Sequence, residues 1–282
     1  MPIALDNLTD AQRLLLAQWL PGLDQVADRS WGLVATTVLE VVHRGSRYIV
    51  KAGGAGDRHI ARELEAHRGW LTPWTNAGRA PSLAFGDVGA KLLVTRYLEG
   101  ELVEGHPCQA APHVFRQAGE LLAQLHAQPS RVDPNYERHV NARALTWLDR
   151  PHRIVATTVD TLRRAIASWP TPSVALVPTH GDWQPRNWLI HGDEVRVIDF
   201  GRAALRPAMT DFTRLAAQDF AGAPELEQAF IAGYGDDPRT SDAWLRVQVR
   251  EAIGTAAWAF QVGDPAFEAH GHALLANVLT RL

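Results

Sequence analysis

Residues 180–201 read HGDWQPRNWLIHGDEVRVIDFG, and this stretch decides how the chain is interpreted. The segments NWLI and VRVIDFG, joined by the polar HGDE, predict a two-strand hairpin after the irregular loop HGDWQPR. Side chains alternate along strands, so Asn187 at one strand's entrance and Asp199 at the other's exit are expected at the same end. Their amide and carboxylate oxygens are ligands that Mg²⁺ prefers. The alternative is an ordinary turn whose Asn and Asp side chains bond the local backbone.

The loop before this hairpin carries a further acidic group. Asp182 lies five residues before Asn187, where its carboxylate is placed to orient a nucleophilic hydroxyl group. His180 is expected to pack beneath the loop and hold its shape, because Asp182 is the better base. The arrangement H-x-D-x-x-x-x-N followed by D-F-G has the order of the catalytic loop and metal-binding segment of protein kinases.

The first 98 residues predict a small α+β lobe. Thr9 and Gln12 form an S/T-x-x-E/Q capping box at the start of a helix, which Pro-Gly at 21–22 ends. Strands rich in Val, Ile and Tyr predict an antiparallel hairpin, followed by an amphipathic helix and a second hairpin. The predicted ranges are 31–42 and 47–52 for the first hairpin, 57–71 for the helix and 82–100 for the second hairpin.

Residues 99–282 predict a second lobe that is mostly helical. Pro112 is placed to start a helix, and apolar residues at helical spacing follow it. The hairpin within 187–201 is expected to be the only β structure of this half. The fold class is therefore α+β, with a small antiparallel sheet and one main helix in the first lobe. The further predicted helical ranges are about 140–168, 209–220, 224–234, 241–262 and 266–281.

Lys51 ends the second strand of the first hairpin and is one of only two lysines in the chain. Lysine and arginine are not interchangeable at functional sites, so this choice of lysine needs a reason. Ile60, Glu63 and His67 share one face of the following helix, which favours Glu63 over Glu65 as the carboxylate that pairs with Lys51. We therefore expect an ion pair between Lys51 and Glu63.

These motifs together resemble those of the aminoglycoside phosphotransferase and choline kinase superfamily, small-molecule relatives of protein kinases. The resemblance covers nearly the whole chain, and the H-G-D, N and D-F-G set is its most specific part. It implies a bilobal, protein-kinase-like fold that uses Mg²⁺ with ATP or GTP. The matching segments are HGDWQPRNWLI, VIDFGRA, YIVKAG, RELEA, LLVTRYLEG, GELLAQLHA, TDFTRLA and FIAGYG.

The resemblance also implies a role for each residue of the set. Asp182 would accept or orient the proton of the acceptor hydroxyl, and Asn187 and Asp199 would hold Mg²⁺. Lys51, held by Glu63, would position the α- and β-phosphates of the nucleotide. The reaction implied is transfer of the γ-phosphoryl group to a hydroxyl of a small molecule.

The segment between the lobes would bind the adenine ring. The resemblance implies that the backbone of Arg96 and Leu98 bonds the adenine edge, with Thr95 behind it.

Three features depart from the family or from protein kinases. The loop WGLVATT at 31–37 lacks G-x-G-x-x-G, Arg96 replaces an acidic or neutral hinge residue, and Arg186 stands where a small residue is common.

Charge suggests the class of acceptor. The net charge of −3 argues against nucleic acid as a partner, which usually needs a clustered basic face. Residues 171–282 contain nine arginines, no lysine and 14 acidic residues. An acidic helical lobe favours a cationic acceptor, such as an aminoglycoside or a cationic peptide antibiotic. The candidate contacts are Asp149, Asp219, Asp264 and Glu268, with Trp147, Trp183, Trp188 and Trp258 as aromatic faces, although surface or core roles are the ordinary expectation for each.

Composition limits the remaining choices. The single cysteine, Cys108, allows no intrachain disulfide and follows no metal-binding spacing. The sequence shows no signal-peptide pattern and no apolar run near the roughly 18 residues of a membrane span. We expect a cytoplasmic protein without membrane or nucleic-acid partners, present as a monomer or weak dimer.

Two functions of other classes stay open at this point. A binding module that resembles a kinase would keep the fold without turnover, although the complete set of motifs argues against it. A metal-dependent hydrolase would use His180, Asp182 and Asp199 and would require neither ATP nor Lys51. Consumption of ATP that depends on Mg²⁺ separates both alternatives from a phosphotransferase.

Overall fold

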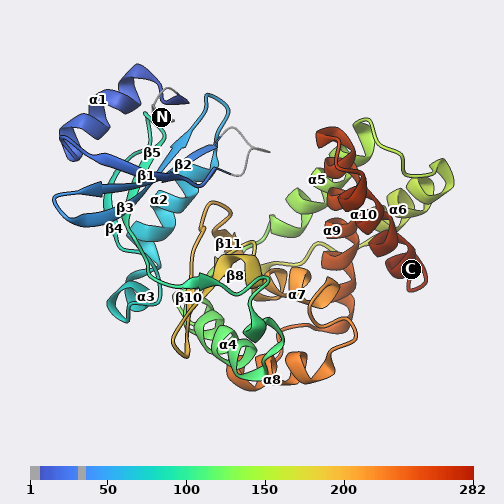
Figure 1. Cartoon of the computed structure of the whole chain (residues 1–282). Helices are drawn as coiled ribbons and strands as arrows, with labels where there is room; N and C mark the ends of the chain where they lie inside the picture. The colour runs from blue at the N-terminus through green and yellow to red at the C-terminus, as the bar shows by residue number, and fades with distance from the viewer. Residues whose placement is uncertain (1–6, 31–35) are drawn as a thin grey trace. The chain divides into compact units, whose positions relative to one another are not determined.

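The computed structural model describes residues 7–30 and 36–282 (Figure 1). The chain forms two compact units, each built from segments that are distant in the sequence. The predicted lobe boundary between residues 98 and 99 stays a prediction. Unit 1 comprises Met1–Gln128, His180–Ala204 and Glu225–Gly235, and unit 2 comprises Pro129–Thr179, Leu205–Pro224 and Asp236–Leu282.

Unit 1 contains an antiparallel sheet of five strands in the order β1-β2-β3-β5-β4. Both predicted hairpins are confirmed, as β2–β3 and β4–β5, whereas β1 at the sheet edge was not predicted. Residues 31–35 of the first predicted strand, and most of the loop at 31–37, lie outside the described residues. The strands are β1 (Asp24–Asp28), β2 (Thr36–His43), β3 (Ser46–Gly53), β4 (Leu83–Asp87) and β5 (Leu92–Arg96).

Helices α1 (Asp10–Trp19) and α2 (His59–Gly69) pack against different sets of side chains of this sheet. Val50 and Val94 pack in one buried cluster with leucines of α1, whereas Leu93 packs with Ile60 and Leu64 of α2. Successive residues of a strand point to opposite faces, so Lys51 points to the α2 side because its neighbour Val50 points to the α1 side. The alternation of the strand therefore directs Lys51 toward α2.

The segment between β3 and α2 is fixed by polar contacts. The predicted capping box is confirmed, because Thr9 N–H donates to Gln12 Oε1 and Gln12 N–H donates to Thr9 Oγ1. Gln12 Nε2 also donates to the carbonyl of Gly53 at 3.0 Å, and Lys91 Nζ donates to the carbonyls that follow. Asp57 Oδ1 then accepts the first N–H groups of α2. These bonds set where α2 begins, and with it the position of Glu63.

The remainder of unit 1 combines helices with a small sheet. The helices α4 and α8 approach closely, because a Cβ at Gly119 would collide with the carbonyl of Phe230 and one at Gly233 with that of Arg116. The sheet has the order β10-β9-β6. The bounds are α3 (Thr72–Asn76), β6 (Glu101–Leu102), η2 (Pro107–Ala110), α4 (Pro112–His126), η3 (Pro185–Asn187), β9 (Trp188–His191), β10 (Glu194–Val197) and α8 (Pro224–Tyr234).

Unit 2 is mostly helical and also contains a three-stranded sheet of order β11-β8-β7. The expectation that 187–201 forms the only β structure of residues 99–282 was wrong, since β6 in unit 1 and strands β7, β8 and β11 also lie in that range. The predicted helical stretch 140–168 is two helices, interrupted near Pro151. The bounds are β7 (Arg131–Asp133), α5 (Tyr136–Asp149), α6 (Ala156–Ser168), β8 (Val174–Thr179), β11 (Ala204–Arg206), η4 (Ala208–Phe212), α7 (Thr213–Ala217), α9 (Ser241–Val262) and α10 (Pro265–Leu279).

The predicted fold class is confirmed as a mixed fold with a five-stranded antiparallel sheet and many helices. Among the described residues, no helix has both the length and the apolar character that a bilayer crossing requires.

Candidate active site

The β9–β10 hairpin brings the two predicted metal ligands to one end. Trp188 pairs with Val197 across the hairpin, and Ile198 N–H donates to the carbonyl of Asn187 at 3.0 Å. Asn187 precedes β9 and Asp199 follows β10, so both lie at the open end, opposite the turn. This is the arrangement that strand alternation predicts for the sequence.

Asp199 adopts a backbone conformation that is rare for residues with a side chain. Its φ angle is 65°, in the left-handed region, which Asp and Asn tolerate better than most residues. Such strain concentrates at functional sites, where the surrounding structure holds it in place. The nearby Lys51 ammonium holds the pKa of Asp199 well below its usual range. Asp199 is therefore an exposed carboxylate that stays ionised at neutral pH.

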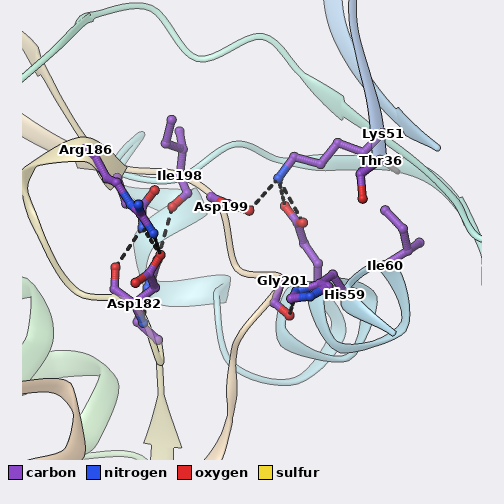
Figure 2. A network of polar contacts seen from close by, with 12 residues as sticks. Thr36, Lys51, His59, Ile60, Asp182, Arg186, Ile198, Asp199 and Gly201 are labelled. Carbon is purple, nitrogen blue, oxygen red and sulfur yellow. Dashed lines mark hydrogen bonds and ion pairs between the residues drawn. The ribbon is translucent and has the colours of Figure 1, made fainter. Parts of the chain in front are cut away.

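Lys51 pairs with Glu63, as the face of α2 predicts, and not with the exposed Glu65. Lys51 Nζ lies 2.9 Å from each carboxylate oxygen of Glu63 and 3.0 Å from Oδ1 of Asp199 (Figure 2). Burial alone would lower the pKa of Lys51, but the charges of Asp199 and Glu63 outweigh it and raise that pKa well above its usual value. Lys51 thus stays cationic between two carboxylates.

His180 supports the loop through both nitrogens of its ring. Its Nδ1 accepts the backbone N–H of Asp182 at 3.3 Å, so Nε2 carries the proton and donates to the carbonyl of Ile198 at 3.1 Å. The side chain is completely buried. These contacts tie the loop to the strand that leads to Asp199, which agrees with the structural role expected for this histidine.

The carboxylate of Asp182 receives three side-chain hydrogen bonds from its own loop. Gln184 Nε2 donates to Oδ1 at 2.6 Å, while Arg186 Nη2 and Asn187 Nδ2 donate to Oδ2 at 2.6 and 3.1 Å. Sequence reasoning did not predict the contacts of Gln184 and Arg186. Their separations from Asp182, two and four residues, carry no signal in an irregular loop, where no periodicity says which side chains meet.

The donor set fits Mg²⁺. The amide nitrogen of Asn187 is turned toward Asp182, since it also donates to the Asp182 backbone carbonyl at 2.7 Å, so its amide oxygen points elsewhere. An amide oxygen and the ionised carboxylate of Asp199 are hard ligands, and Mg²⁺ is commonly bound by one or two carboxylates together with phosphate oxygens and water.

The predicted adenine-binding segment follows β5. Thr95 is buried, and the backbone N–H of Arg96 donates to the carbonyl of Ser82 at 2.9 Å. The N–H of Tyr97 is also used, by the carbonyl of Arg47 at 3.0 Å. If this segment binds adenine, its contacts are therefore the carbonyl of Arg96 and the N–H of Leu98, which makes the exposed Arg96 side chain less important.

Phe200 makes ring contacts both with α2 and with the loop that carries Asp182. Its ring meets those of His67, Trp74 and His180, with centroids 5.7, 6.0 and 5.1 Å apart. His59 at the start of α2 adds a hydrogen bond between Nδ1 and the carbonyl of Gly201 at 2.9 Å. Helix α2, which carries Glu63, therefore contacts the segment that carries Asp199 through His67 with Phe200 and through His59 with Gly201.

Unit 2 contains the acidic residues proposed to attract a cation, and each of them makes contacts within the protein. Asp149 pairs with Arg163 at 2.6 Å, Glu268 pairs with Arg153 at 3.3 Å, and Asp264 caps α10 through the N–H of Phe267. Asp219 is half-buried in the turn after α7. Of the aromatic candidates, Trp147 in unit 2 lies under Arg150, and Trp258 packs against Phe267. In unit 1, Trp183 and Trp188 are completely buried, so they belong to the core.

A known protein family matches about three quarters of this chain. The profile of the family described as "Phosphotransferase enzyme family" matches residues 35–247. No curated protein sequence matches the chain significantly.

Solved structures with the same fold include three kinds of phosphotransferase. The aminoglycoside phosphotransferase APH(4)-Ia, in a ternary complex with ADP and hygromycin B, has a TM-score of 0.68 and 13% identity, over 96% of this chain and 98% of that one. A macrolide 2'-phosphotransferase type I has a TM-score of 0.63 and 21% identity, over 95% and 98%. Choline kinase LicA from Streptococcus pneumoniae has a TM-score of 0.65 and 14% identity, over 97% and 100%. At these identities the likeness establishes the fold alone.

Proposed function

The chain belongs to the phosphotransferase enzyme family, and on that premise we propose that it transfers the γ-phosphoryl group of ATP to a hydroxyl group of a small molecule. The observation that carries the proposal is the Lys51 ammonium held between Glu63 and Asp199. That arrangement fits a nucleotide phosphate site next to a metal ligand. GTP is the alternative donor.

Each residue of the site has a separate role in the proposed reaction. Lys51, oriented by Glu63, binds phosphate oxygens, and Asp182 accepts a hydrogen bond from the acceptor hydroxyl and orients its oxygen toward the γ-phosphorus. The new O–P bond forms as the bond between the γ-phosphorus and the β–γ bridging oxygen breaks, so that ADP leaves and the hydroxyl proton passes to Asp182. Asn187 and Asp199 would hold Mg²⁺, which when bound neutralises charge on the phosphate oxygens.

For the acceptor, we propose a cationic small molecule, such as an aminoglycoside or a cationic peptide antibiotic. Support comes from the excess of five negative charges in residues 171–282. Because Asp149, Asp264 and Glu268 have structural partners, the attraction would come from the summed charge of this segment rather than from these three carboxylates.

A coupled assay of ADP release tests the proposal. The purified chain is incubated with ATP and Mg²⁺ and with a panel that includes hygromycin B, a macrolide, choline and a neutral sugar alcohol. We expect ADP release that requires Mg²⁺ and rises with one class of acceptor, with the phosphorylated product identified by mass. Nucleotide binding without turnover across the panel would instead support the binding module, and metal-dependent hydrolysis without ATP would support the hydrolase.

A further inference from the structure

The loop that carries Asp182 also contains Arg186, a cation to which the proposed reaction assigns no role. Arg186 Nη2 lies 2.6 Å from Oδ2 of Asp182, and the Asp182 side chain is only 5% exposed, whereas that of Arg186 is 36% exposed. Figure 2 shows this contact between Arg186 and Asp182. The ion pair joins a buried carboxylate to a partly exposed guanidinium. A buried carboxylate is costly unless it is paired and hydrogen-bonded, so this cation offsets the burial of Asp182.

The side-chain donors of this loop bond different oxygens of Asp182. Oδ2 accepts from both Arg186 and Asn187, whereas Gln184 donates to Oδ1. A carboxylate oxygen has two lone pairs in the plane of the group, so two donors occupy the usual positions around Oδ2. The orientation of the carboxylate is therefore set before an acceptor arrives.

The charge of Arg186 also bears on the transfer itself. A guanidinium makes charge-assisted hydrogen bonds about twice as strong as neutral ones and stays protonated at any physiological pH. The Arg186 charge lies beside Asp182, the group proposed to orient the attacking oxygen. Negative charge develops on the phosphoryl group during transfer, and a nearby cation stabilises it. Lys51, which contacts Glu63 and Asp199, is the cation that the proposed reaction already assigns to the phosphates.

We propose that Arg186 is a positioning residue for phosphoryl transfer, which holds the carboxylate of Asp182 in the orientation that meets the acceptor hydroxyl. This inference rests on the proposed phosphotransferase function. It assigns a role to a residue at which the sequence departs from the family pattern, and it assigns to Gln184 the support of Oδ1.

The test compares Arg186→Ala with Arg163→Ala. Arg163 is a matched control, because its Nη2 also lies 2.6 Å from an aspartate oxygen, that of Asp149, and its side chain is 37% exposed. Steady-state kinetics use Mg²⁺, ATP and the panel compound with the highest turnover. We expect Arg186→Ala to lower kcat by about 100-fold, typical of a misplaced catalytic group, with the KM for ATP nearly unchanged. Arg163→Ala should retain kcat within about twofold, as for an exposed ion pair.

A chemical rescue separates positioning from a general structural role. Millimolar guanidinium, well below denaturing concentrations, should recover about tenfold of the lost kcat in Arg186→Ala and leave Arg163→Ala unchanged. The inference is wrong if Arg186→Ala keeps wild-type kcat, if it loses ATP affinity instead, or if guanidinium restores nothing.

Two further variants keep the test decisive if Arg186→Ala does not fold. Arg186→Lys retains the charge, and Arg186→Gln retains a neutral donor, so the inference predicts a higher kcat for the lysine variant at matched melting temperatures. Equal kcat values for the two would overturn it. Failure of the proposed function has a different signature, since the wild-type chain would then release no ADP with any acceptor.

Discussion

The ammonium of Lys51 lies 3.0 Å from a carboxylate oxygen of Asp199, although the two residues are 148 positions apart in the chain. One comes from β3 of the five-stranded sheet and the other from the segment after β10. Glu63 on α2 completes the contact, so three elements meet at one charged atom. Changes at this atom should therefore affect both folding and nucleotide binding.

Replacing Lys51 with Met should remove nucleotide binding and also destabilise the protein. Glu63, which is 3% exposed, would be left as a buried charge without its partner, a change that typically costs about 3–5 kcal/mol. The double variant Lys51→Met with Glu63→Gln should recover most of this stability but no activity. Urea unfolding and ATP titration calorimetry check the two effects, and a double variant as unstable as the single one would contradict the explanation.

Asp199→Asn should abolish turnover that depends on Mg²⁺ while the protein stays folded. Asparagine tolerates the φ angle of 65° as aspartate does, but a neutral amide cannot replace a carboxylate between metal and phosphates. The measurement is ADP release across a Mg²⁺ titration, together with a melting curve. Normal turnover at millimolar Mg²⁺ would remove Asp199 from the metal site.

Asp182→Asn should separate chemistry from binding. The amide keeps the shape of the carboxylate but loses its capacity to accept the hydroxyl proton, so kcat should fall by at least about 100-fold. Nucleotide affinity should stay nearly constant, because Lys51 and Asp199 are unchanged. Calorimetry that shows lost nucleotide binding with an intact kcat would exchange the roles of Asp182 and Asp199.

His67 should make the stability of the protein depend on mildly acidic pH. Burial, reinforced by the charge of Lys51, lowers the pKa of His67 to about 4. Between pH 6.5 and 4 the unfolded chain binds a proton at His67 that the folded chain does not, so the free energy of unfolding falls as the pH falls through this range. Over this whole pH range the free energy of unfolding should fall by about 3 kcal/mol because of His67. Urea unfolding at pH 7 and pH 5 should show a smaller loss in His67→Leu than in the wild type, and equal losses would refute this account.

A cationic acceptor should bind less tightly as salt increases. Exposed charges lose most of their reach beyond about 8–10 Å at physiological ionic strength, so a field from the acidic segment weakens with salt. The KM of a cationic and of a neutral hydroxyl compound, measured at low and high salt, checks this. A neutral compound with the better kcat/KM and no salt dependence would remove the cationic acceptor and leave the phosphotransferase assignment intact.

The elements that sequence could predict are those with a strong local pattern. The hairpin β2–β3 is rich in Val, Ile and Tyr on both sides of a Gly-containing turn, and α2 places Ile60, Glu63 and His67 on one face. The capping box at Thr9 depends on two residues three positions apart. In each case the interaction that stabilises the element lies within a few residues, so the sequence carries its signature.

The elements that sequence reasoning missed depend on distant partners. Strand β8 contains Pro178, which argues against a strand, and it pairs with the three-residue β7. Strand β6 has two residues, which pair with β9. Within the site, strand alternation could predict that Asn187 and Asp199 lie at the same end of the hairpin. The contact of Arg186 with Asp182 could not, because an irregular loop has no fixed spacing.

The scarcity of lysine has a practical consequence for labelling chemistry. Lys51 and Lys91 are the only lysines, and Lys91 bonds the carbonyls of Gly54 and Ala55, close after Lys51 in the chain. Apart from the terminal amine, amine-reactive reagents therefore have side-chain targets only in this part of the molecule. A nucleotide carrying an acyl phosphate would modify one peptide, and protection of that peptide by unlabelled ATP would report occupancy by mass spectrometry without knowledge of the acceptor.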